Sequence, residues 1–369
     1  MADWTMARVA LALSFLPLPA ACLAADAPKV PTVSPEGRHY LSQPLTSKIY
    51  TADPSAHVFN GKIYVYPSHD VPVDIESDDL GNQYAMHDYI VLQMDRVGAP
   101  VKIGKVALDV KDVPWASKQM WAPDAAYKNG TYYLFFPARD KNEDSRGLGQ
   151  FKIGVATSKN PMGPFKAEPE PIKGAYSMDP AVFTDDDGQA YMYFGGIWGG
   201  QLQRWATGTF NVNGTDTDLQ QDDKPALSGK VARLTDDMKQ LAEAPRDAVI
   251  LDAAGKPVLG GDHEKRFFEA SWVFKKDGKY YYTYSTGDTH FLNYAIGTSP
   301  YGPFTYTGHI LQPVQGWTSH HSIIQHEGKW WLFYADTQIS NKNHLRNVKV
   351  TELKFNADGT IQTINPFTD

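Results

Sequence analysis

The sequence predicts an all-β fold, a five-bladed β-propeller, from a segment that is repeated five times. Each copy contains a strand, a tight turn that ends in glycine, and a second strand rich in Tyr, Phe or Trp. The turn glycines are Gly61, Gly130, Gly188, Gly278 and Gly328. Subtracting successive positions gives intervals of 69, 58, 90 and 50 residues. These intervals average about what four strands with their loops require for one blade.

All five turns carry Asn-Gly, Asp-Gly or Glu-Gly, which between alternating apolar residues indicates a β-hairpin. Residues 62–66 and 279–284 are two of the expected strands after such turns. A second repeated element, IGVATSKNPMGPF and YAIGTSPYGPF, shows that the repeat unit is longer than one hairpin. The longest interval contains a polar stretch, residues 199–260, with a possible strand at 248–251. No long amphipathic helix or linker is evident, so we expect a single propeller domain over residues 48–369.

Composition limits the class of partner. Of the 369 residues, 42% are apolar and 21% are charged, as in a soluble globular protein with an ample core. The net charge of -7 argues against nucleic acid or an anionic membrane as a partner, because neither would meet a basic surface.

The N-terminal residues resemble an export signal. Arg8 precedes an apolar run that is too short and too interrupted by proline for a membrane span, and small residues suit cleavage near Ala24. We therefore expect a signal peptide over residues 1–24, an extended leader over 25–47, and a periplasmic or extracellular protein. Cys22 is the only cysteine, which leaves the mature chain without a disulfide. The alternative of a lipoprotein acylated at Cys22 is less favoured, because the preceding residues fit that signal poorly.

Carboxylates recur at the start of the repeats. Asp53 and Asp179 each precede a proline, and with Glu269 they lie eight or nine residues before a turn glycine. A single Asp-Pro pair usually stabilises a local turn. Equivalent positions in different blades of a propeller surround one central axis, however, so the recurrence predicts that these three side chains converge. Carboxylates that share a pocket repel one another, which favours a functional site over a structural one.

Three acids in one cavity suit glycoside hydrolysis. One carboxylic acid protonates the departing glycosidic oxygen, and an ionised one activates water or attacks the sugar. Their environments must separate their pKa values, and a third carboxylate can help to keep the acid protonated.

The motifs YTADPSA, MWAPD, YSMDPAVF, FFEASWVFKKDGKYYYTYSTGD and TSHHSIIQHEGKWWLFY resemble glycoside hydrolase family 43, from about residue 48 to about residue 366. The resemblance implies a five-bladed propeller that inverts the anomeric configuration. It implies that Asp53 is the general base, Glu269 the general acid, and Asp179 the residue that modulates the pKa of the acid and orients it. In an inverting enzyme the acid and base stand about 6.5–9.5 Å apart to admit water.

Other residues have weaker signals. Asp124 opens the second repeat, but proline precedes it and Gly130 lies only six residues on, so we expect a structural role. Trp121 in the same motif and Trp317 before the histidine pair are candidates for sugar-binding walls. Most propeller tryptophans belong to the core, and we expect the same of Trp198. Arg346 resembles an arginine that reaches sugar hydroxyls in the family. A plain surface ion pair is an equal alternative for it.

The fifth repeat opens with His320 and His321 in place of an acid. A single histidine is more often structural than a ligand. In the resembled family, however, a histidine here commonly holds a cation, often calcium, through water on the propeller axis, and His320 is the better match. Calcium prefers oxygen ligands, so such an ion would be structural or would tune nearby pKa values. The chemistry itself would require no cofactor.

The motifs resemble most closely the subgroup that acts on xylan-derived oligosaccharides. This implies an exo-acting β-xylosidase with α-L-arabinofuranosidase activity. An endo-arabinanase, which would need an open groove, and a non-catalytic sugar-binding propeller are the alternatives. A fructan hydrolase would need a different first motif and a sialidase would need Asp boxes with an arginine cluster, and the sequence has neither.

Overall fold

The computed structural model describes residue 1 and residues 30–143, 149–317 and 320–369. Strands in these residues form five sheets that follow one another along the chain. The first sheet has the strands β1 (Tyr50–Phe59), β2 (Lys62–Asp70), β3 (Asp88–Met94) and β4 (Lys102–Asp109). The second has β5 (Ala116–Lys118), β6 (Asp124–Lys128), β7 (Thr131–Glu143), β8 (Gly149–Ser158) and β9 (Lys166–Ala167).

The remaining three sheets continue the pattern. The third has β10 (Ala181–Thr184), β11 (Ala190–Phe194), β12 (Lys230–Arg233) and β13 (Arg246–Asp247). The fourth has β14 (Ile250–Leu251), β15 (Glu269–Lys276), β16 (Lys279–Ser285), β17 (Leu292–Gly297) and β18 (Phe304–Leu311). The fifth has β19 (His321–His326), β20 (Lys329–Asp336) and β21 (Asn347–Leu353).

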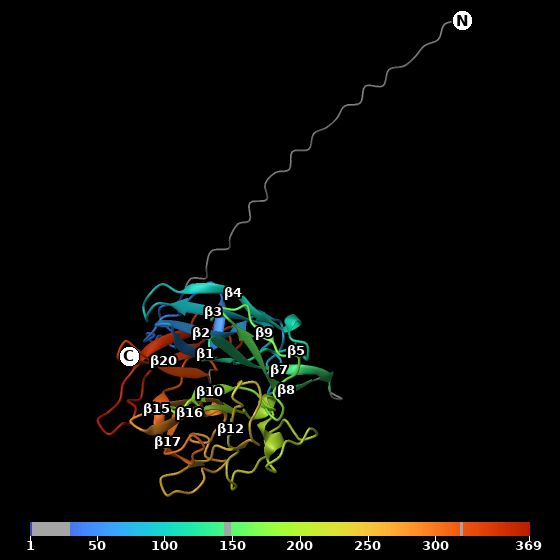
Figure 1. Ribbon diagram of the computed structural model, residues 1–369. Helices are drawn as coiled ribbons and strands as arrows, with labels where there is room; N and C mark the ends of the chain where they lie inside the picture. The colour runs from blue at the N-terminus through green and yellow to red at the C-terminus, as the bar shows by residue number, and fades with distance from the viewer. Residues whose placement is uncertain (2–29, 144–148, 318–319) are drawn as a thin grey trace.

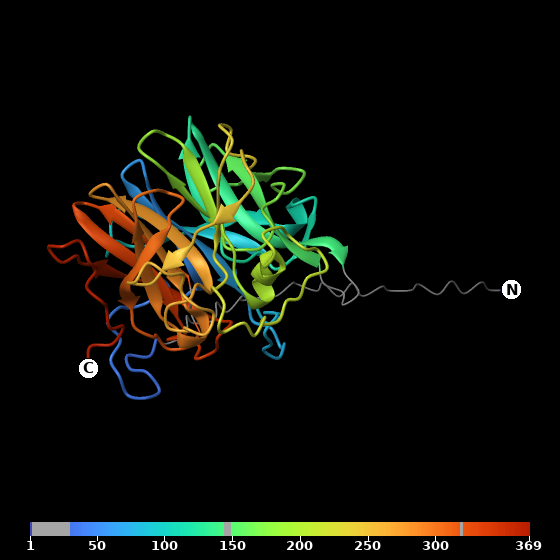
Figure 2. The ribbon, with the colours of Figure 1, turned by 90° about the horizontal axis from the view of Figure 1, so that it is seen from below.

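The sheets are arranged as a closed ring. The first strand of each repeat faces the centre: β1 contacts β6, β6 contacts β10, β10 contacts β15, β15 contacts β19, and β19 returns to β1. Figure 1 shows the red strand β20 beside the blue strands β1 and β2, where the last sheet meets the first. Figure 2 shows the blue, green and orange sheets splayed around a common centre. The predicted five-bladed β-propeller is therefore confirmed, and we call the sheets blades I to V.

The turns explain why the repeats form hairpins. In four of the five, the glycine and the residue before it both have positive φ, as a type I′ turn requires. Asn60 and Gly61 have φ of 51° and 73°, and Glu327 and Gly328 have 51° and 74°. Adjacent strands then pair antiparallel, as Val58 with Ile63 in blade I and Gln325 with Trp330 in blade V.

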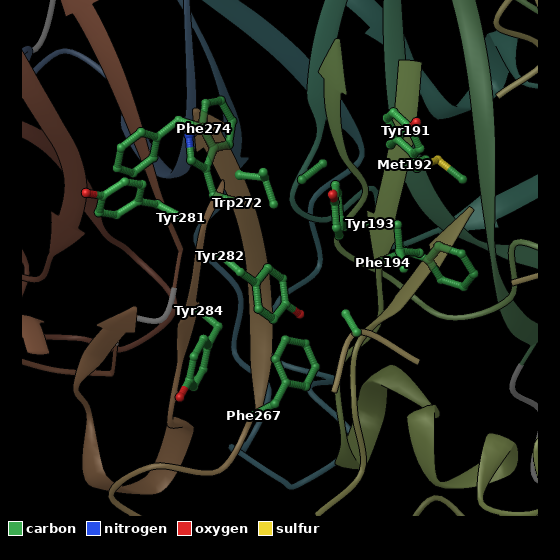
Figure 3. Close-up of a cluster of buried hydrophobic side chains, with 14 of the residues drawn as sticks. Tyr191, Met192, Tyr193, Phe194, Phe267, Trp272, Phe274, Tyr281, Tyr282 and Tyr284 are labelled. Carbon is green, nitrogen blue, oxygen red and sulfur yellow. The ribbon is translucent and has the colours of Figure 1, made fainter. Parts of the chain in front are cut away.

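Aromatic residues of the second strands fill the space between blades. Between blades III and IV, Tyr193 of β11 and Tyr282 of β16 have ring centroids 5.8 Å apart, and both are fully buried. Figure 3 shows this layer, with residues of β11 on one side and those of β15 and β16 on the other. Burial of such rings is the main source of stability for an all-β ring without disulfides.

Short 3-10 turns are the only helical elements in the part of the chain that the structure describes. They are η1 (Val110–Asp112), η2 (Trp198–Gly200), η3 (Leu202–Trp205) and η4 (Gly287–Thr289). Within the same residues, no helix is both long and apolar enough to cross a membrane.

The end of the expected leader packs on the domain. Tyr40 is 6% exposed and forms an isolated bridge with Phe367, and the amide of Leu45 donates to the carbonyl of Val348 in β21. The expected signal peptide, residues 1–24, and Cys22 lie outside the described residues apart from Met1.

Candidate active site

The three predicted carboxylates lie around one cavity. Asp53, Asp179 and Glu269 line a cavity of about 260 Å³, together with His320 and Arg346. Asp53 belongs to β1, Asp179 lies just before β10, Glu269 begins β15, and His320 lies just before β19. The convergence that the repeats predict at the starts of the inner strands is thus present in the fold.

Local backbone geometry turns these side chains toward the cavity. Asp53 and Asp179 have φ of 48° and 56°, and Ala270, next to Glu269, has φ of 66°. Pairing of β1 with β2 shifts register between Ala52 and Ser55, and that of β15 with β16 shifts beside Glu269. A left-handed conformation costs free energy for a residue with a side chain, and such strain concentrates at functional sites.

Asp53 is held by a network of donors. It is 4% exposed. Nη1 of Arg346 donates to Oδ1 of Asp53 at 2.7 Å, and Nη2 donates to Oδ2 at 3.1 Å. The hydroxyl of Ser68 donates to the same Oδ2 at 2.7 Å. Burial opposes ionisation, but Arg346, His320 and Ser68 outweigh it and lower the pKa of Asp53. The group is therefore a carboxylate at neutral pH.

Arg346 is also bound by a fourth acid, Asp70, at the end of β2. Nε and Nη2 of Arg346 donate to Oδ2 and Oδ1 of Asp70 at 3.0 and 2.9 Å, and its backbone N–H donates to Oδ2 at 2.7 Å. Arg346 is 5% exposed, so the alternative of a surface ion pair is wrong. Burial raises the pKa of Asp70, although Arg346 opposes this.

Asp179 pairs with the histidine of the fifth blade. Nε2 of His320 lies 2.9 Å from Oδ2 of Asp179, and the amide of Ala270 donates to the same oxygen at 3.2 Å. Burial opposes the charge on His320, but Asp179, Asp53 and Glu269 raise its pKa to about 9. Asp179 thus connects the backbone beside Glu269 to an imidazolium.

Glu269 is partly exposed to the cavity and lies against the backbone of blade III. A methyl group added at Gly196 would stand 3.0 Å from Cβ of Glu269 and 3.4 Å from its Oε2. The same methyl group would stand 2.2 Å from Cε of Met178, so glycine at this position lets the segment after β11 pack closely against Met178 and Glu269.

Aromatic rings form two walls of the cavity. Trp121 and Tyr84 lie on one side, joined by a hydrogen bond of 2.8 Å from the indole N–H to the carbonyl of Tyr84. Phe268, Trp198 and Trp317 lie together on the other, with ring centroids 4.9 to 6.1 Å apart. Trp121 and Trp317, the two predicted sugar-binding walls, both line the cavity, and Trp198, which we expected in the core, lines it as well.

Loops close the cavity over blade II. The amide of Gly199 donates to the carbonyl of Asp79 at 3.1 Å, which joins the loop after β2 to the segment after β11. The side chain of Gln119 in blade II donates to the carbonyl of Gly81 at 2.9 Å. An open groove across this side of the propeller is therefore blocked.

Asp124 does not line this cavity. It is 1% exposed and accepts hydrogen bonds from His57 Nε2 at 2.7 Å, from the amide of Ala125 at 2.7 Å and from the amide of Val182 at 2.5 Å. The hydroxyl of Ser55 donates to it as well. Asp124 thereby ties blades I, II and III together, as a structural residue would.

The surroundings of His320 do not suit direct binding of a metal ion to its Nε2. That atom contacts Asp179, and the raised pKa of about 9 makes the ring a cation at neutral pH. Among residues 30–143, 149–317 and 320–369, no three His, Cys, Asp or Glu side chains are grouped to hold an ion.

Sequence reasoning missed several residues of the site. Asp70 and Ser68 lie in the second strand of blade I, outside the repeated position, and Tyr84 lies in an irregular loop. Phe268 immediately precedes Glu269, and its position beside the expected acid was the one signal available. Ser68 reaches Asp53 through the pairing of β1 with β2, so the register of that hairpin was a second signal.

An aromatic-walled cavity with converging carboxylates on a propeller axis indicates a glycoside hydrolase. Comparison with known proteins agrees: residues 101–361 match the family described as Glycosyl hydrolases family 43. The chain belongs to glycosyl hydrolase family 43 and is an enzyme of that class.

Curated relatives and solved structures extend over most of the chain. It is 56% identical to xylosidase/arabinosidase 43A of Humicola insolens, over 88% of this chain and 99% of the relative. It is 50% identical to a β-xylosidase of Xylanibacter ruminicola, over 85% of this chain and 97% of the relative.

Among solved structures, a family 43 β-xylosidase/α-arabinofuranosidase from a compost microbial metagenome is 55% identical, with a TM-score of 0.85, and was solved with xylotriose in a calcium-free form. The match covers 93% of this chain and 100% of that one.

Proposed function

We propose that this enzyme releases xylose from the ends of xylan-derived oligosaccharides with inversion, and that it also releases α-L-arabinofuranose. The observation that carries the proposal is the convergence of Asp53, Asp179 and Glu269 in one cavity closed over blade II. The relatives named xylosidase/arabinosidase and β-xylosidase support the choice of sugar.

In the proposed mechanism Asp53 is the general base. Its lowered pKa keeps it ionised, so it can take a proton from a water molecule as the water oxygen attacks the anomeric carbon. Arg346 holds the carboxylate in place, and its remaining surface faces the cavity, where sugar hydroxyls can accept from it.

Glu269 is the general acid. It gives its proton to the glycosidic oxygen as the bond to the anomeric carbon breaks, so one water is consumed and two sugar products form. Asp179 orients the acid, because its carboxylate accepts a hydrogen bond from the amide of Ala270, the residue next to Glu269. No cofactor is needed for these proton transfers.

Exo-action follows from the closed side of the cavity. An oligosaccharide cannot pass through a cavity whose blade II side is bridged by the contact of Gly199 with Asp79, so one end of the chain must enter. An endo-arabinanase would need the opposite arrangement, and a non-catalytic sugar-binding propeller would not need three converging acids.

The test is hydrolysis of xylobiose and of p-nitrophenyl β-D-xyloside, with the anomer of the first product followed by NMR. We expect α-xylose to appear first, and Glu269→Gln to abolish turnover of xylobiose. A product that keeps the β configuration would refute inversion, and release of internal fragments from arabinan would favour the endo-arabinanase.

A water-mediated calcium ion near His320 stays part of the proposal. It is supported by one solved relative, whose structure is specified as a calcium-free form. The test measures activity and melting temperature with and without a chelator. If neither changes, the proposed calcium ion is refuted.

We also propose export across a membrane, supported by the apolar run after Arg8. Expression with and without residues 1–24, followed by cell fractionation, tests this. An acylated Cys22 would appear as a mass increase in the membrane fraction.

A further inference from the structure

A buried arginine of blade II lies behind one wall of the main cavity. Arg139, in β7, is 1% exposed and does not itself line the cavity. Its Nε donates to Oε1 of Gln119, and its Nη1 donates to the carbonyl of Gly149 at 2.9 Å. Its Nη2 makes a longer bond of 3.4 Å to the carbonyl of Leu80, and its Cζ lies 4.3 Å from the ring centroid of Phe151. The proposed proton transfers do not involve this buried cation.

Two of these contacts hold the backbone of the loop over residues 77–84, most of which lines the main cavity. Arg139 binds the carbonyl of Leu80 itself. Gln119 reaches the next carbonyl, because its Nε2 donates to Gly81 at 2.9 Å. Gln119 is buried and has φ of 56°, a left-handed conformation that costs free energy and is concentrated at functional sites. The pair of Arg139 and Gln119 therefore fixes the middle of this loop.

The same loop packs closely against the aromatic wall formed by Trp121. A methyl group added at Gly81 would stand 2.7 Å from Cη2 of Trp121, so glycine lets the backbone touch the indole. The indole N–H in turn donates to the carbonyl of Tyr84 at 2.8 Å. The ring of Tyr84 lies 5.0 Å from Cζ of Arg346, the residue that holds Asp53. A shift of the loop would thus displace the side chains that face the sugar.

Phe151 connects the arginine to the same wall by a second route. Its ring is fully buried, contacts the guanidinium of Arg139, and has its centroid 4.3 Å from that of Trp121. The amide of Phe151 donates to Oε1 of Gln201 at 3.1 Å. Gln201 directly follows η2, which carries Trp198 of the other aromatic wall. Arg139 is therefore linked through Phe151 to both walls of the cavity.

The loop also closes the cavity over blade II, and this closure depends on Leu80. The amide of Gly199 donates to the carbonyl of Asp79 at 3.1 Å. A methyl group added at Gly199 would stand 2.6 Å from the carbonyl oxygen of Leu80, which Arg139 binds. The close approach of the two segments therefore requires Leu80 to stay where Arg139 holds it.

We infer that Arg139 is a positioning residue for sugar binding, which acts through Gln119 and Phe151 on the loop over residues 77–84 and on Trp121. This inference rests on the proposed function. A purely structural arginine would change the fraction of enzyme that folds, and with it the apparent kcat, but not the KM of the folded enzyme. A positioning residue of the sugar-binding wall instead raises KM and leaves kcat of the folded enzyme nearly unchanged.

The test compares Arg139→Lys with a matched change at another buried arginine. Lysine keeps the charge, but it lacks the planar group that stacks on Phe151 while donating to Gln119. We expect KM for xylobiose to rise about fivefold or more. The kcat of the folded enzyme should stay within about threefold of wild type, and the pH profile of kcat should keep its shape, because Arg139 does not contact the proposed acid or base.

The matched control is Arg204→Lys. Arg204 is 3% exposed, and its guanidinium binds Asp216 and the carbonyl of Val212. None of these residues lines the main cavity. The control should lower the melting temperature, as Arg139→Lys should, but its KM for xylobiose should match that of the wild type. An equal rise of KM in both variants would show a general effect of lost stability and would overturn the inference.

Gln119→Glu keeps the test decisive if Arg139→Lys folds poorly. The new carboxylate can still accept from Nε of Arg139, but it cannot donate to the carbonyl of Gly81, so the link to the loop is lost. KM for xylobiose should rise about threefold or more, with kcat near the wild-type value. An unchanged KM, or a fall in kcat alone, would overturn the inference while leaving the xylosidase assignment intact. A wild-type enzyme that does not hydrolyse xylobiose would instead refute the proposed function.

Discussion

The guanidinium of Arg346 is held by the carboxylate of Asp70 while it holds that of Asp53. Asp70 accepts at 2.9 and 3.0 Å from the side chain, and Asp53 accepts at 2.7 and 3.1 Å. Arg346 comes from the segment before β21, and both acids come from blade I, so the contact also joins the last blade to the first. The arginine is therefore fixed in orientation, and its charge is divided between two acids.

Asp70→Asn should lower the basicity of Asp53, the proposed general base, although Asp53 itself is unchanged. Removal of a neighbouring negative charge makes protonation of Asp53 less favourable, so the pKa of Asp53 should fall further below its ordinary value. The acid limb of the kcat/KM profile should move to lower pH, and kcat at neutral pH should fall about tenfold because the base is weaker.

The matched control is Asp95→Asn, which removes a surface carboxylate that pairs with Lys62. Its pH profile should coincide with that of the wild type. An acid limb of Asp70→Asn that stays in place or moves to higher pH would contradict the role of Asp70.

Asp53→Asn and Asp124→Asn should separate catalysis from stability. Both acids occupy the start of a repeat, but only Asp53 lines the cavity, whereas Asp124 accepts four hydrogen bonds in the interior. We expect Asp53→Asn to lower kcat of the folded enzyme by about 10³-fold, and also to lower its stability, because the buried Arg346 loses a charged partner. Asp124→Asn should lower the free energy of unfolding by about 2–4 kcal/mol and leave kcat of the folded enzyme close to wild type. Activity assays beside thermal melts decide this, and the reverse pattern would exchange the two roles.

His320 should make stability depend on pH in the alkaline range. Its pKa is raised from the ordinary value of 6.5 to about 9 in the folded protein, so the native state binds the proton more tightly than the unfolded chain. Its contribution is complete below pH 6.5 and is lost as the pH rises to about 9, on the order of 3 kcal/mol in all.

His320→Asn tests this contribution. The free energy of unfolding of the wild type, measured by denaturant titration, should decline between pH 6.5 and 9 more steeply than that of the variant. At pH 6.5 the variant should be the less stable protein, because Asp179 loses its cationic partner. Parallel curves over this range would show that His320 does not carry the charge.

The repeats made much of this fold predictable. Asn60-Gly61 and its counterparts adopt the turn that the residue pair favours, and Asp53, Asp179 and Glu269 face one cavity because the same place in each blade faces the axis. Asp124 shows the limit of that reasoning. It is paired within β6 opposite Phe135 rather than left in a bulge, so its carboxylate enters the interior.

Contacts created by ring closure were not predictable from the sequence. Asp70 and Arg346 are 276 positions apart in the chain, and no sequence pattern near either residue predicts their ion pair.

The leader beyond the expected signal should contribute to stability, because Tyr40 is buried by residues from the far end of the chain. Its ring lies 5.6 Å from that of Phe367 and 4.1 Å from Nζ of Lys349, and its hydroxyl donates to Gln315 in the loop that carries Trp317. Tyr40→Ala should lower the free energy of unfolding by about 3–5 kcal/mol, as for other buried aromatic residues.

The same change should raise KM for xylobiose, because Gln315 and hence the loop before Trp317 lose a contact. Leu41→Ala is the matched control, since Leu41 is 40% exposed and its truncation should cost less than about 1 kcal/mol. Thermal melts and Michaelis–Menten kinetics on both variants test the point. A Tyr40→Ala enzyme as stable as Leu41→Ala would mean that the catalytic domain folds without its leader.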